Sequence, residues 1–398
     1  MHQPVCHEAA AGDEPLAVSP ELADVFRLYG EKYALTHPLP HSHREVMSAI
    51  EVCRTAFLGG RVEECDHCRE KVILYNSCSN RHCPKCGAMA TAKWLEARLA
   101  EVLPVSYFHG TFTVPHKLNP LIRCNKQVAL AILFKAVSET LQQFAHNKGG
   151  LIGVTAVLHT WDQQLNDHFH LHCLIPAGML SLDRSRWIPV NPKFLFPVRA
   201  LSTVFRAKFL DYLEDAFAQG KLIFPGKTAS LETPAEFAAL MRQVNGKKKE
   251  WVVDCRPPFA GPKTVIDYLA RYTHRIAISN NRILDVSDGK VTFQYKDRKD
   301  NNETKTVTLE ADEFIRRFLL HVLPHGFQRV RHYGLFANRS KKHNLARCRE
   351  LLNVPAFPQP AGESTRERML RLTGIDIALC PHCKKGTLHF VREIPSFS

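Results

Sequence analysis

The sequence predicts an α+β fold in which helices pack against an antiparallel sheet. Residues 153–161 (GVTAVLHTW) and 168–175 (HFHLHCLI) are rich in strand-forming side chains and flank the loop DQQLND, a pattern typical of a β-hairpin. Residues 125–146 repeat apolar side chains with the period of an amphipathic helix. Because so short a connection joins antiparallel strands, we expect the sheet to be antiparallel around this hairpin.

Before the hairpin, helical patterns precede a single strand pattern. Residues 20–58 predict two helices, and Gly59-Gly60 ends the second. Residues 86–103 predict a third helix, which Pro104 stops. Residues 105–114 (VSYFHGTFTV) alternate and are β-rich, so we expect a strand there.

After the hairpin, residues 180–255 are mixed and poorly periodic. Gly261-Pro262 is expected to open a helix that runs to about Thr273, because proline suits the first helical turn. Residues 311–323 predict a further helix, and a basic tail follows it. Three short strands are expected at 275–279, 282–287 and 291–296.

The chain is basic and has the apolar content of a protein with a buried core. Its 398 residues include 53 Lys and Arg against 39 Asp and Glu, a net charge of +14, and 45% are hydrophobic. That length allows two or three domains. The positive surplus favours a polyanionic partner such as nucleic acid, because Lys and Arg that neutralise phosphates release condensed counterions. A merely positive surface is the alternative.

Neither an export signal nor a membrane span is expected. No apolar run of the length of a signal peptide follows Met1, and no window approaches the roughly 20 apolar residues of a membrane helix. We therefore expect a cytosolic protein without a membrane partner. The 13 cysteines are then better explained by metal binding than by disulfides.

Two CxxC pairs crowd the segment CDHCREKVILYNSCSNRHCPKC. Cys65 and Cys68 form one pair, Cys83 and Cys86 the other, with fourteen residues between them. Two such turns can present four thiolates tetrahedrally to Zn²⁺ at about 2.3 Å each. We therefore expect a structural zinc in an N-terminal module, with four free thiols as the alternative. Cys78 and His82 are nearby candidates for a supporting role.

A third CxxC pair, Cys380 and Cys383, supplies only half of a metal site. His389 or Cys348 could complete a second zinc site, and an exposed turn is the alternative.

Three histidines alternate in HFHLHCLI: His168, His170 and His172. On a strand they share one face, where burial is costly unless they are paired or bound to metal. Two of them with a third ligand would leave open positions on a divalent ion that can polarise a phosphate oxygen. His159 on the preceding strand is the preferred third ligand, because His168 lies at the strand's start. A solvent-facing histidine-rich strand is the alternative.

Two tyrosines, Tyr268 and Tyr272, are four residues apart in VIDYLARYTHR. On a helix they would lie on one face, as would Arg271 and Arg275, a pair suited to phosphate. A phenol with a pKa near 10 attacks a phosphate only when that phosphate is already polarised. Core packing is the alternative explanation of the tyrosine spacing.

The segment from Arg316 to Arg349 holds nine Lys and Arg and no acidic residue, with aromatic side chains interleaved. Cations beside aromatic rings suit single-stranded nucleic acid, whose bases stack while its phosphates meet the charges. We expect Arg329 and Arg331 to contribute to DNA binding. A solvated basic face is the alternative.

Together these motifs resemble a known family, the IS91-like rolling-circle insertion-sequence transposases of bacteria. The resemblance covers nearly the whole chain in the family's order. CRTAFLGGRVEECDHC and NSCSNRHCPKC resemble the zinc module, LHTWDQQLNDHFHLHCLIPAG and YLARYTHRIAISNNRI the catalytic core, and FIRRFLLHVLPHGFQRVRHYGLFAN and ALCPHCKKG the C-terminal part.

The resemblance implies an HUH (His–hydrophobic–His) endonuclease domain, an antiparallel sheet with packed helices. His170 and His172 would hold Mg²⁺ or Mn²⁺, and Tyr268 and Tyr272 would be the nucleophiles. A tyrosine would cut single-stranded DNA at transposon ends or target, forming a 5′-phosphotyrosine and freeing a 3′-hydroxyl, and joining would reverse the step. Phe169 stands where the family usually has proline, which puts no ligand in doubt.

The implied organisation has three parts: a helical, zinc-binding module at 1–104, an HUH-type catalytic domain at 105–310 and a basic region at 311–398. Residues 180–255 would be an insertion in the catalytic domain. Such a bacterial protein would be cytoplasmic and associated with the nucleoid through DNA.

Other functions are compatible with parts of the sequence. An HUH replication initiator or relaxase would share the histidines and tyrosines. A non-enzymatic zinc-module DNA-binding regulator would need neither, and a zinc hydrolase built on the histidine row would ignore the tyrosines. The oligomeric state is not indicated.

Overall fold

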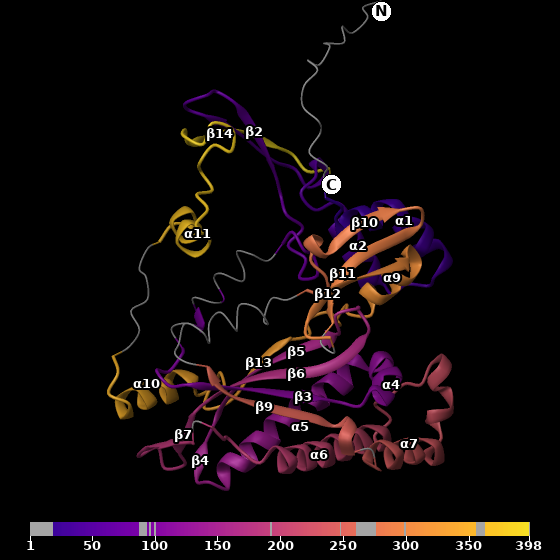
Figure 1. The fold of residues 1–398 in the computed structure, drawn as a ribbon, viewed down its shortest axis with the longest axis vertical. Helices are drawn as coiled ribbons and strands as arrows, with labels where there is room; N and C mark the ends of the chain where they lie inside the picture. Colours follow the sequence, from indigo (N-terminus) through magenta and orange to yellow (C-terminus); the bar gives the residue numbers. More distant parts are fainter. Residues whose placement is uncertain are drawn as a thin grey trace, which may run out of the picture.

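The chain forms a large sheet covered by helices, a second body of helices and strands, and a small sheet that joins segments from both ends of the chain (Figure 1). The computed structural model describes residues 19–86, 94, 97–98, 101–191, 193–246, 248–259, 276–297, 300–355 and 363–397. Helices and antiparallel sheets make it an α+β structure, which confirms the predicted fold class.

The largest sheet has five strands, and every neighbouring pair is antiparallel. The predicted hairpin lies within it as β5 and β6, and the predicted strand at 105–114 is β3 beside them. In spatial order the strands are β13 (Val330–Gly334), β5 (Gly153–Trp161), β6 (Asp167–Pro176), β3 (Tyr107–Thr113) and β9 (Val252–Phe259).

Helices α5 (Lys126–His146) and α6 (Val198–Ala218) cover one face of this sheet, as Figure 1 shows. Alternate side chains of the strands point toward them, including Phe112, Leu158 and Phe169, all nearly inaccessible to solvent. Because side chains alternate along a strand, the intervening residues lie on the opposite face, where the histidines of β5 and β6 are found.

The second body is built from residues that precede β3 and from residues that follow β9 in the chain. Helices α1 (Leu22–Thr36) and α2 (His41–Glu51) share an apolar core with α9 (Ala311–Leu319) and a separate three-stranded sheet. Phe26 of α1 meets Phe318 of α9 edge to face at 5.6 Å between ring centroids. The strands of that sheet are β10 (Ile283–Ser287), β11 (Lys290–Asp297) and β12 (Glu303–Glu310).

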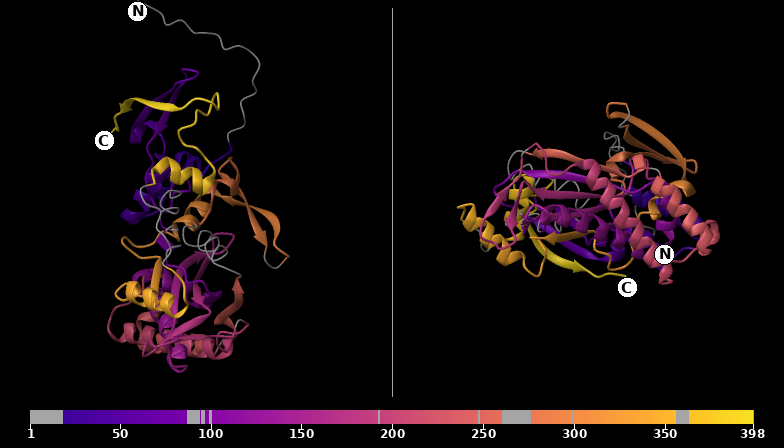
Figure 2. Two further views of the ribbon diagram at one scale, coloured as in Figure 1. Left: turned by 90° about the vertical axis from the view of Figure 1, so that its left-hand side faces the viewer. Right: turned by 90° about the horizontal axis from the view of Figure 1, so that it is seen from below.

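A third sheet pairs the two ends of the chain. The hairpin β1 (Gly60–Cys65) and β2 (Lys71–Tyr75) receives the C-terminal strand β14 (Leu388–Ile394) along β1. The left view of Figure 2 shows the yellow C-terminal strand beside the indigo hairpin.

The segment 180–255, which the sequence predicts to be a poorly periodic insertion in the core, contains regular elements that pack in the core. Its helix α6 buries Leu201, Phe205, Phe209 and Leu213 in the main core, and its last strand, β9, is an edge of the main sheet. The segment also contains α7 (Pro234–Gly246). It therefore completes the five-stranded sheet and helps to cover one face of it.

Two further expectations differ from the structure. Strand β13 belongs to the main sheet although it lies in the expected C-terminal region, so the sequence boundary at 310 does not separate two spatial units. The expected strand at 275–279 is absent over its described residues, 276–279, where Ala277 and Ile278 are buried in the second body's core instead.

The remaining elements are short or peripheral. No helix among the described residues is long and apolar enough to cross a membrane. The remaining helices are α4 (Asn119–Cys124), α10 (Lys341–Leu351) and α11 (Thr365–Thr373). The 3₁₀ turns are η1 (Ala56–Leu58), η2 (His116–Leu118), η3 (Gly226–Glu232), η4 (Lys248–Glu250) and η5 (Asn280–Arg282). A fourth sheet consists of β4 (Gly150–Leu151), β7 (Gly178–Ser181) and β8 (Trp187–Pro189).

Candidate metal centre

Three histidines meet on the face of the main sheet that the core helices do not cover. His159 on β5 pairs directly with His170 on β6, and His172 is two residues further along the same strand. One ring nitrogen from each can be chosen so that all three lie within 4.8 Å of one another. All three side chains are buried, so the cluster is part of the interior.

The spacing of these rings suits a shared metal ion. The Nε2 atoms of His170 and His172 are 3.0 Å apart. Two imidazole nitrogens that bind one ion at about 2.0–2.1 Å lie roughly 2.9–3.4 Å apart for bond angles between a right angle and a tetrahedral one. The two nitrogens therefore already have the separation of neighbouring ligands.

Each of the two β6 histidines has a partner for its other ring nitrogen. His170 Nδ1 lies 2.8 Å from the carbonyl oxygen of His168, which can only accept, so that Nδ1 carries the proton. The lone pair is thereby left on Nε2, which faces His172. A hydrogen bond of this kind fixes the tautomer and the ring orientation of a metal-binding histidine.

His172 is oriented by a residue that sequence reasoning did not single out, His109 on β3. His109 Nε2 lies 2.8 Å from His172 Nδ1. Burial, and next the nearby charge of Arg256, lower the pKa of His109 to about 4, so its imidazole is neutral at neutral pH and can accept a hydrogen bond. His109 and Thr111 lie two residues apart on a strand that the sequence predicts, so both side chains lie on one face of the sheet. The sequence could therefore have indicated which face His109 occupies.

Residues of the second body hold the tip of the hairpin. Leu165 is fully buried in the core of α1, α2 and α9, with a left-handed φ of 62°. The Nε2–H of His321 donates to the Leu165 carbonyl at 3.0 Å, and its Nδ1 lies 3.2 Å from the Thr160 hydroxyl. Arg317 donates to the carbonyl of Gln164 at 3.1 Å. The hairpin that carries the histidines is thus fixed at its turn by distant residues.

The proposed nucleophiles and their neighbours lie outside the described residues. These are Tyr268, Tyr272, Arg271 and Arg275. Their roles stay predictions from the sequence.

The two arginines expected to bind DNA have other surroundings. The Arg331 guanidinium lies over the rings of Phe134 and Phe327, 4.4 and 5.0 Å from their centroids, so it packs on core aromatics. Burial, followed by the charge of Arg81, lowers the pKa of Arg329 to about 10. The contribution of these two residues to DNA binding stays a prediction from the sequence.

The cysteines assemble into two groups of four, in which the CxxC pairs have other partners than expected. Cys83 and Cys86 gather with Cys53 and Cys78, and Cys65 and Cys68 gather with Cys380 and Cys383. The expected set of Cys65, Cys68, Cys83 and Cys86 is therefore wrong. The physical reason is that Cys65 and Cys68 sit at the turn of β1–β2, where β14 brings the C-terminal pair, whereas Cys83 and Cys86 face the end of α2.

The first group includes two cysteines, Cys53 and Cys78, that belong to no CxxC pair. Cys53 follows α2 as a single cysteine, and Cys78 is the nearby candidate noted in the sequence. The Sγ atom of Cys86 lies 3.4 Å from that of Cys53 and 3.5 Å from that of Cys78. A hydrogen bond from Cys83 is the main cause that lowers the pKa of Cys78 to about 5, which favours the thiolate that zinc binds.

The partners suggested for the C-terminal pair lie elsewhere. Cys348 is buried in a separate apolar cluster, and His389 Nε2 faces Asp66 at 3.3 Å.

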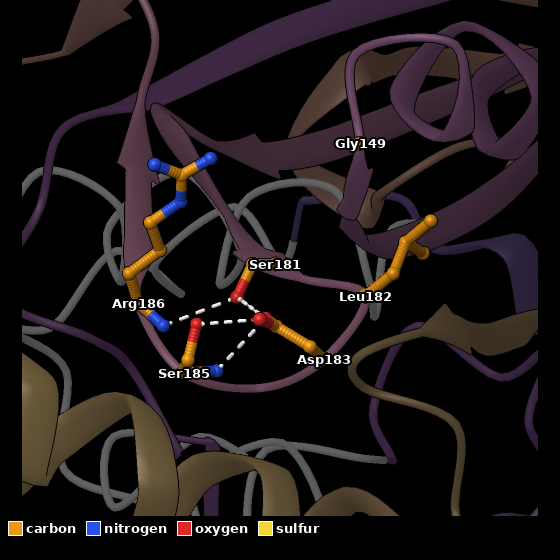
Figure 3. Close-up of a pocket in the computed structure, with 6 residues that line it drawn as sticks. All are labelled: Gly149, Ser181, Leu182, Asp183, Ser185 and Arg186. Atoms are coloured by element: carbon orange, nitrogen blue, oxygen red, sulfur yellow. Dashed lines mark hydrogen bonds between the residues drawn. The ribbon is translucent and has the colours of Figure 1, made fainter.

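A shallow pocket at the β7–β8 turn belongs neither to the histidine cluster nor to the two cysteine groups (Figure 3). Its one carboxylate, Asp183, accepts hydrogen bonds from the hydroxyls of Ser181 and Ser185, and these bonds, that from Ser181 foremost, lower its pKa to about 2. The hydroxyls of Ser181 and Ser185 and the carboxylate of Asp183 thus satisfy one another, as in a structural turn.

Comparison with known proteins agrees with these features. A family model described as "Putative transposase" matches residues 153–344, which contain the histidine hairpin. A second, described as "Transposase zinc-binding domain", matches residues 25–114, which contain the whole first cysteine group. No solved structure matches the chain.

Two known sequences are similar to this chain along most of their length. The chain is 48% identical over 376 residues to "Putative transposase y4qJ" of Sinorhizobium fredii, covering 93% of this chain and 94% of that protein. It is 26% identical over 319 residues to "Transposase for insertion sequence element IS801" of Pseudomonas savastanoi pv. phaseolicola, covering 79% and 75%. On the family models and the first of these relatives, the chain belongs to the IS91-like transposases.

Proposed function

We propose that this transposase nicks and rejoins single-stranded DNA at the ends of an insertion sequence, and at its target, during rolling-circle transposition. The tyrosines Tyr268 and Tyr272 would be the nucleophiles. His170 and His172, with His159 as the third ligand, would hold Mg²⁺ or Mn²⁺.

The observation that carries this proposal is the buried histidine cluster. Imidazoles buried at this spacing are costly unless something shares their nitrogens, and a divalent ion satisfies all three at once. The hydrogen bonds from His170 and His172 leave their Nε2 atoms directed at a common point. Three protein ligands leave positions for substrate oxygen, as in a catalytic site.

A bound divalent ion would supply polarisation of the scissile phosphate and neutralise its developing charge. The chain's own residues do the rest. A tyrosine oxygen attacks phosphorus and forms a P–O bond, while the bond from phosphorus to the 3′ oxygen breaks. The phenol loses its proton and the leaving oxygen gains one, so a 5′-phosphotyrosine and a 3′-hydroxyl result. The reverse attack by a 3′-hydroxyl rejoins DNA without an external energy source.

Two tyrosines would let the protein hold two DNA ends in turn. Arg271 and Arg275, with the chain's net charge of +14, would bring phosphates to the site.

The first cysteine group would hold a structural zinc ion. Four thiolates leave no position for water, so this ion supports the fold and not the chemistry. Its loop also reaches the main sheet's body: the Arg81 guanidinium donates to the carbonyl of Phe327 at 2.9 Å through Nη1.

The histidine cluster also separates this function from a DNA-binding regulator, which would need the cysteines and the positive charge but no buried imidazole triad. It does not separate a transposase from a replication initiator or relaxase, but the family match does.

The test is formation of a covalent protein–DNA adduct. Labelled single-stranded oligonucleotides from the ends of the element would be incubated with the protein and Mg²⁺ or Mn²⁺, then resolved under denaturing conditions. The wild type is expected to form an adduct, and the double variant Tyr268→Phe/Tyr272→Phe is not.

Tyr295→Phe on β11 is the matched control, since it removes a phenol outside the proposed site. It should react as the wild type does. An adduct of undiminished yield in the double variant would overturn the assignment of the nucleophiles, and no cleavage by the wild type on any end sequence would favour the regulator.

A further inference from the structure

The second cysteine group joins opposite ends of the chain. Cys65 and Cys68 occupy the turn that leads from β1 to β2, and Cys380 and Cys383 precede β14. Cys65 is 318 residues from Cys383, and Cys68 is 312 residues from Cys380. The zinc-binding family match ends at residue 114, so it includes only half of this group.

The sulfur positions are those of a tetrahedral thiolate site. The Sγ atoms of Cys65 and Cys383 are 3.7 Å apart, as are those of Cys68 and Cys380. Four thiolates at about 2.3 Å from one zinc ion lie roughly 3.8 Å from each other. A disulfide needs a separation of about 2.05 Å, so these pairs are not disulfides.

The surroundings are shaped for such a site. The backbone N–H of Cys68 donates to Cys65 Sγ at 3.5 Å, and that of Gly386 donates to Cys383 Sγ at 3.4 Å. A Cβ atom at Gly386 would lie 2.4 Å from Cys65 Sγ, so only glycine lets the second turn approach the first. Asp66 fixes the same approach by accepting from the Thr387 N–H at 2.8 Å.

We propose that Cys65, Cys68, Cys380 and Cys383 bind a second zinc ion, which ties the C-terminal strand to the N-terminal hairpin. The proposal is independent of the catalytic function and goes beyond the zinc site that lies wholly within residues 25–114.

The three-stranded sheet of β14, β1 and β2 depends on this ion. An isolated two-stranded hairpin is at best marginally stable in water, and β1–β2 gains its third strand only from β14. The pairing of β14 with β1 closes a loop of more than 300 residues, and this closure carries an entropy cost that zinc binding would offset. The zinc ion joins the two CxxC turns directly next to the pairing strands.

The experiment measures the zinc content of the full-length protein and its variants, all of which keep the histidine site, so that any zinc bound there contributes equally to each of them. The double variant Cys380→Ser/Cys383→Ser should hold one zinc ion per chain fewer than the wild type. Cys65→Ser/Cys68→Ser should lose the same ion, and the quadruple variant should lose no more than either double. Cys124→Ser/Cys255→Ser, two half-buried cysteines outside both groups, should keep the wild-type content.

Hydrogen exchange of the same variants locates the effect. Protection should fall over residues 60–75 and 388–394 and persist over 153–176. A second variant keeps the test decisive if the double variant is poorly soluble: Cys383→His retains a ligand and should retain zinc, whereas Cys383→Ala should lose it.

Three results would overturn the proposal. These are unchanged zinc in Cys380→Ser/Cys383→Ser, loss of two ions in the quadruple variant, and loss of protection spread equally over 153–176.

Discussion

The histidine cluster and the second cysteine group are both sets of side chains that could hold a metal ion, but they are assembled in different ways. The histidines belong to one hairpin, where strand alternation and direct pairing bring them together. The cysteines come from segments more than 300 residues apart, and only the pairing of β1 with β14 brings them together. One site follows from a local pattern, and the other follows from the completed fold.

The histidine site is not purely local, because the hairpin that carries it also depends on distant residues. Its turn is buried in the second body through Leu165, and its histidines are oriented by His109 from the neighbouring strand. The local pattern therefore sets which side chains face the site, whereas distant residues set how firmly they are held. Four changes test this division, in order of the effect expected.

The largest effect is expected from His170→Ala. Loss of a ligand should lower the rate of adduct formation about a thousandfold, which is roughly 4 kcal/mol, the scale of metal stabilisation of a transition state. The rate would be measured at saturating Mn²⁺ with an end oligonucleotide. His146→Ala, an exposed histidine at the end of α5, is the control. Equal rates for His170→Ala and wild type would remove the cluster from the mechanism.

Leu165→Ala should act through stability. Removing a fully buried leucine costs roughly 2–4 kcal/mol, and here the cavity opens between the hairpin turn and the second body. Thermal unfolding would show a lower midpoint, with a smaller change for the half-exposed loop residue Leu182→Ala. If Leu165→Ala were as stable as the control, the hairpin would not need its contact with the second body. The histidine site would then be purely local, unlike the second cysteine group.

His109→Ala should weaken metal binding without removing a ligand. Loss of a residue that orients a metal-binding histidine typically costs about 10–100-fold in affinity or activity. The Mn²⁺ concentration for half-maximal adduct formation should rise, and excess Mn²⁺ should recover much of the rate. His109→Gln, whose side-chain oxygen can accept from His172 Nδ1–H, should be closer to wild type. A fall in the maximal rate with no change in Mn²⁺ requirement would show that His109 acts otherwise.

Mild acid should loosen the hairpin turn through His321. Burial lowers its pKa to about 4, below the ordinary value of 6.5, so the unfolded chain binds a proton between these values and the folded chain does not. The stabilisation is complete above pH 6.5 and is lost as the pH falls toward 4, by roughly 2 kcal/mol between pH 7 and 5.

Thermal unfolding at both pH values would measure this loss. His321→Gln should reduce the pH dependence, and His343→Gln on the exposed side of α10 should not. Identical pH dependence in all three proteins would exclude a contribution from His321.

The sequence predicted features that depend on a local pattern and missed features that depend on contacts between distant residues. The hairpin, strand β3 and helix α5 were predicted near their observed bounds because each carries its period within one short segment. The first cysteine group was missed because Cys53 is a single cysteine after a helix, and the second because no local spacing connects Cys68 with Cys380. The members of both cysteine groups are set by contacts between residues that are far apart in the sequence.

Some errors were avoidable. Leu201, Phe205, Phe209 and Leu213 recur every four residues, so a buried helix face was present in the segment expected to be irregular. In contrast, Ala277 and Ile278 look like part of a strand but are buried without strand pairing, because the second body's core accepts them from a connecting segment. The roles of Tyr268 and Tyr272 rest on sequence, since both lie outside the described residues.

The most direct test of the account is a peptide map of the covalent adduct. Trypsin cuts after Lys263, Arg271 and Arg275, so Tyr268 and Tyr272 fall in different peptides, TVIDYLAR and YTHR. With wild-type protein, Mn²⁺ and an end oligonucleotide, the account predicts the nucleotide mass on one or both of these peptides and its absence in His170→Ala. Attachment to any other peptide, or an equal yield of adduct in His170→Ala, would contradict it.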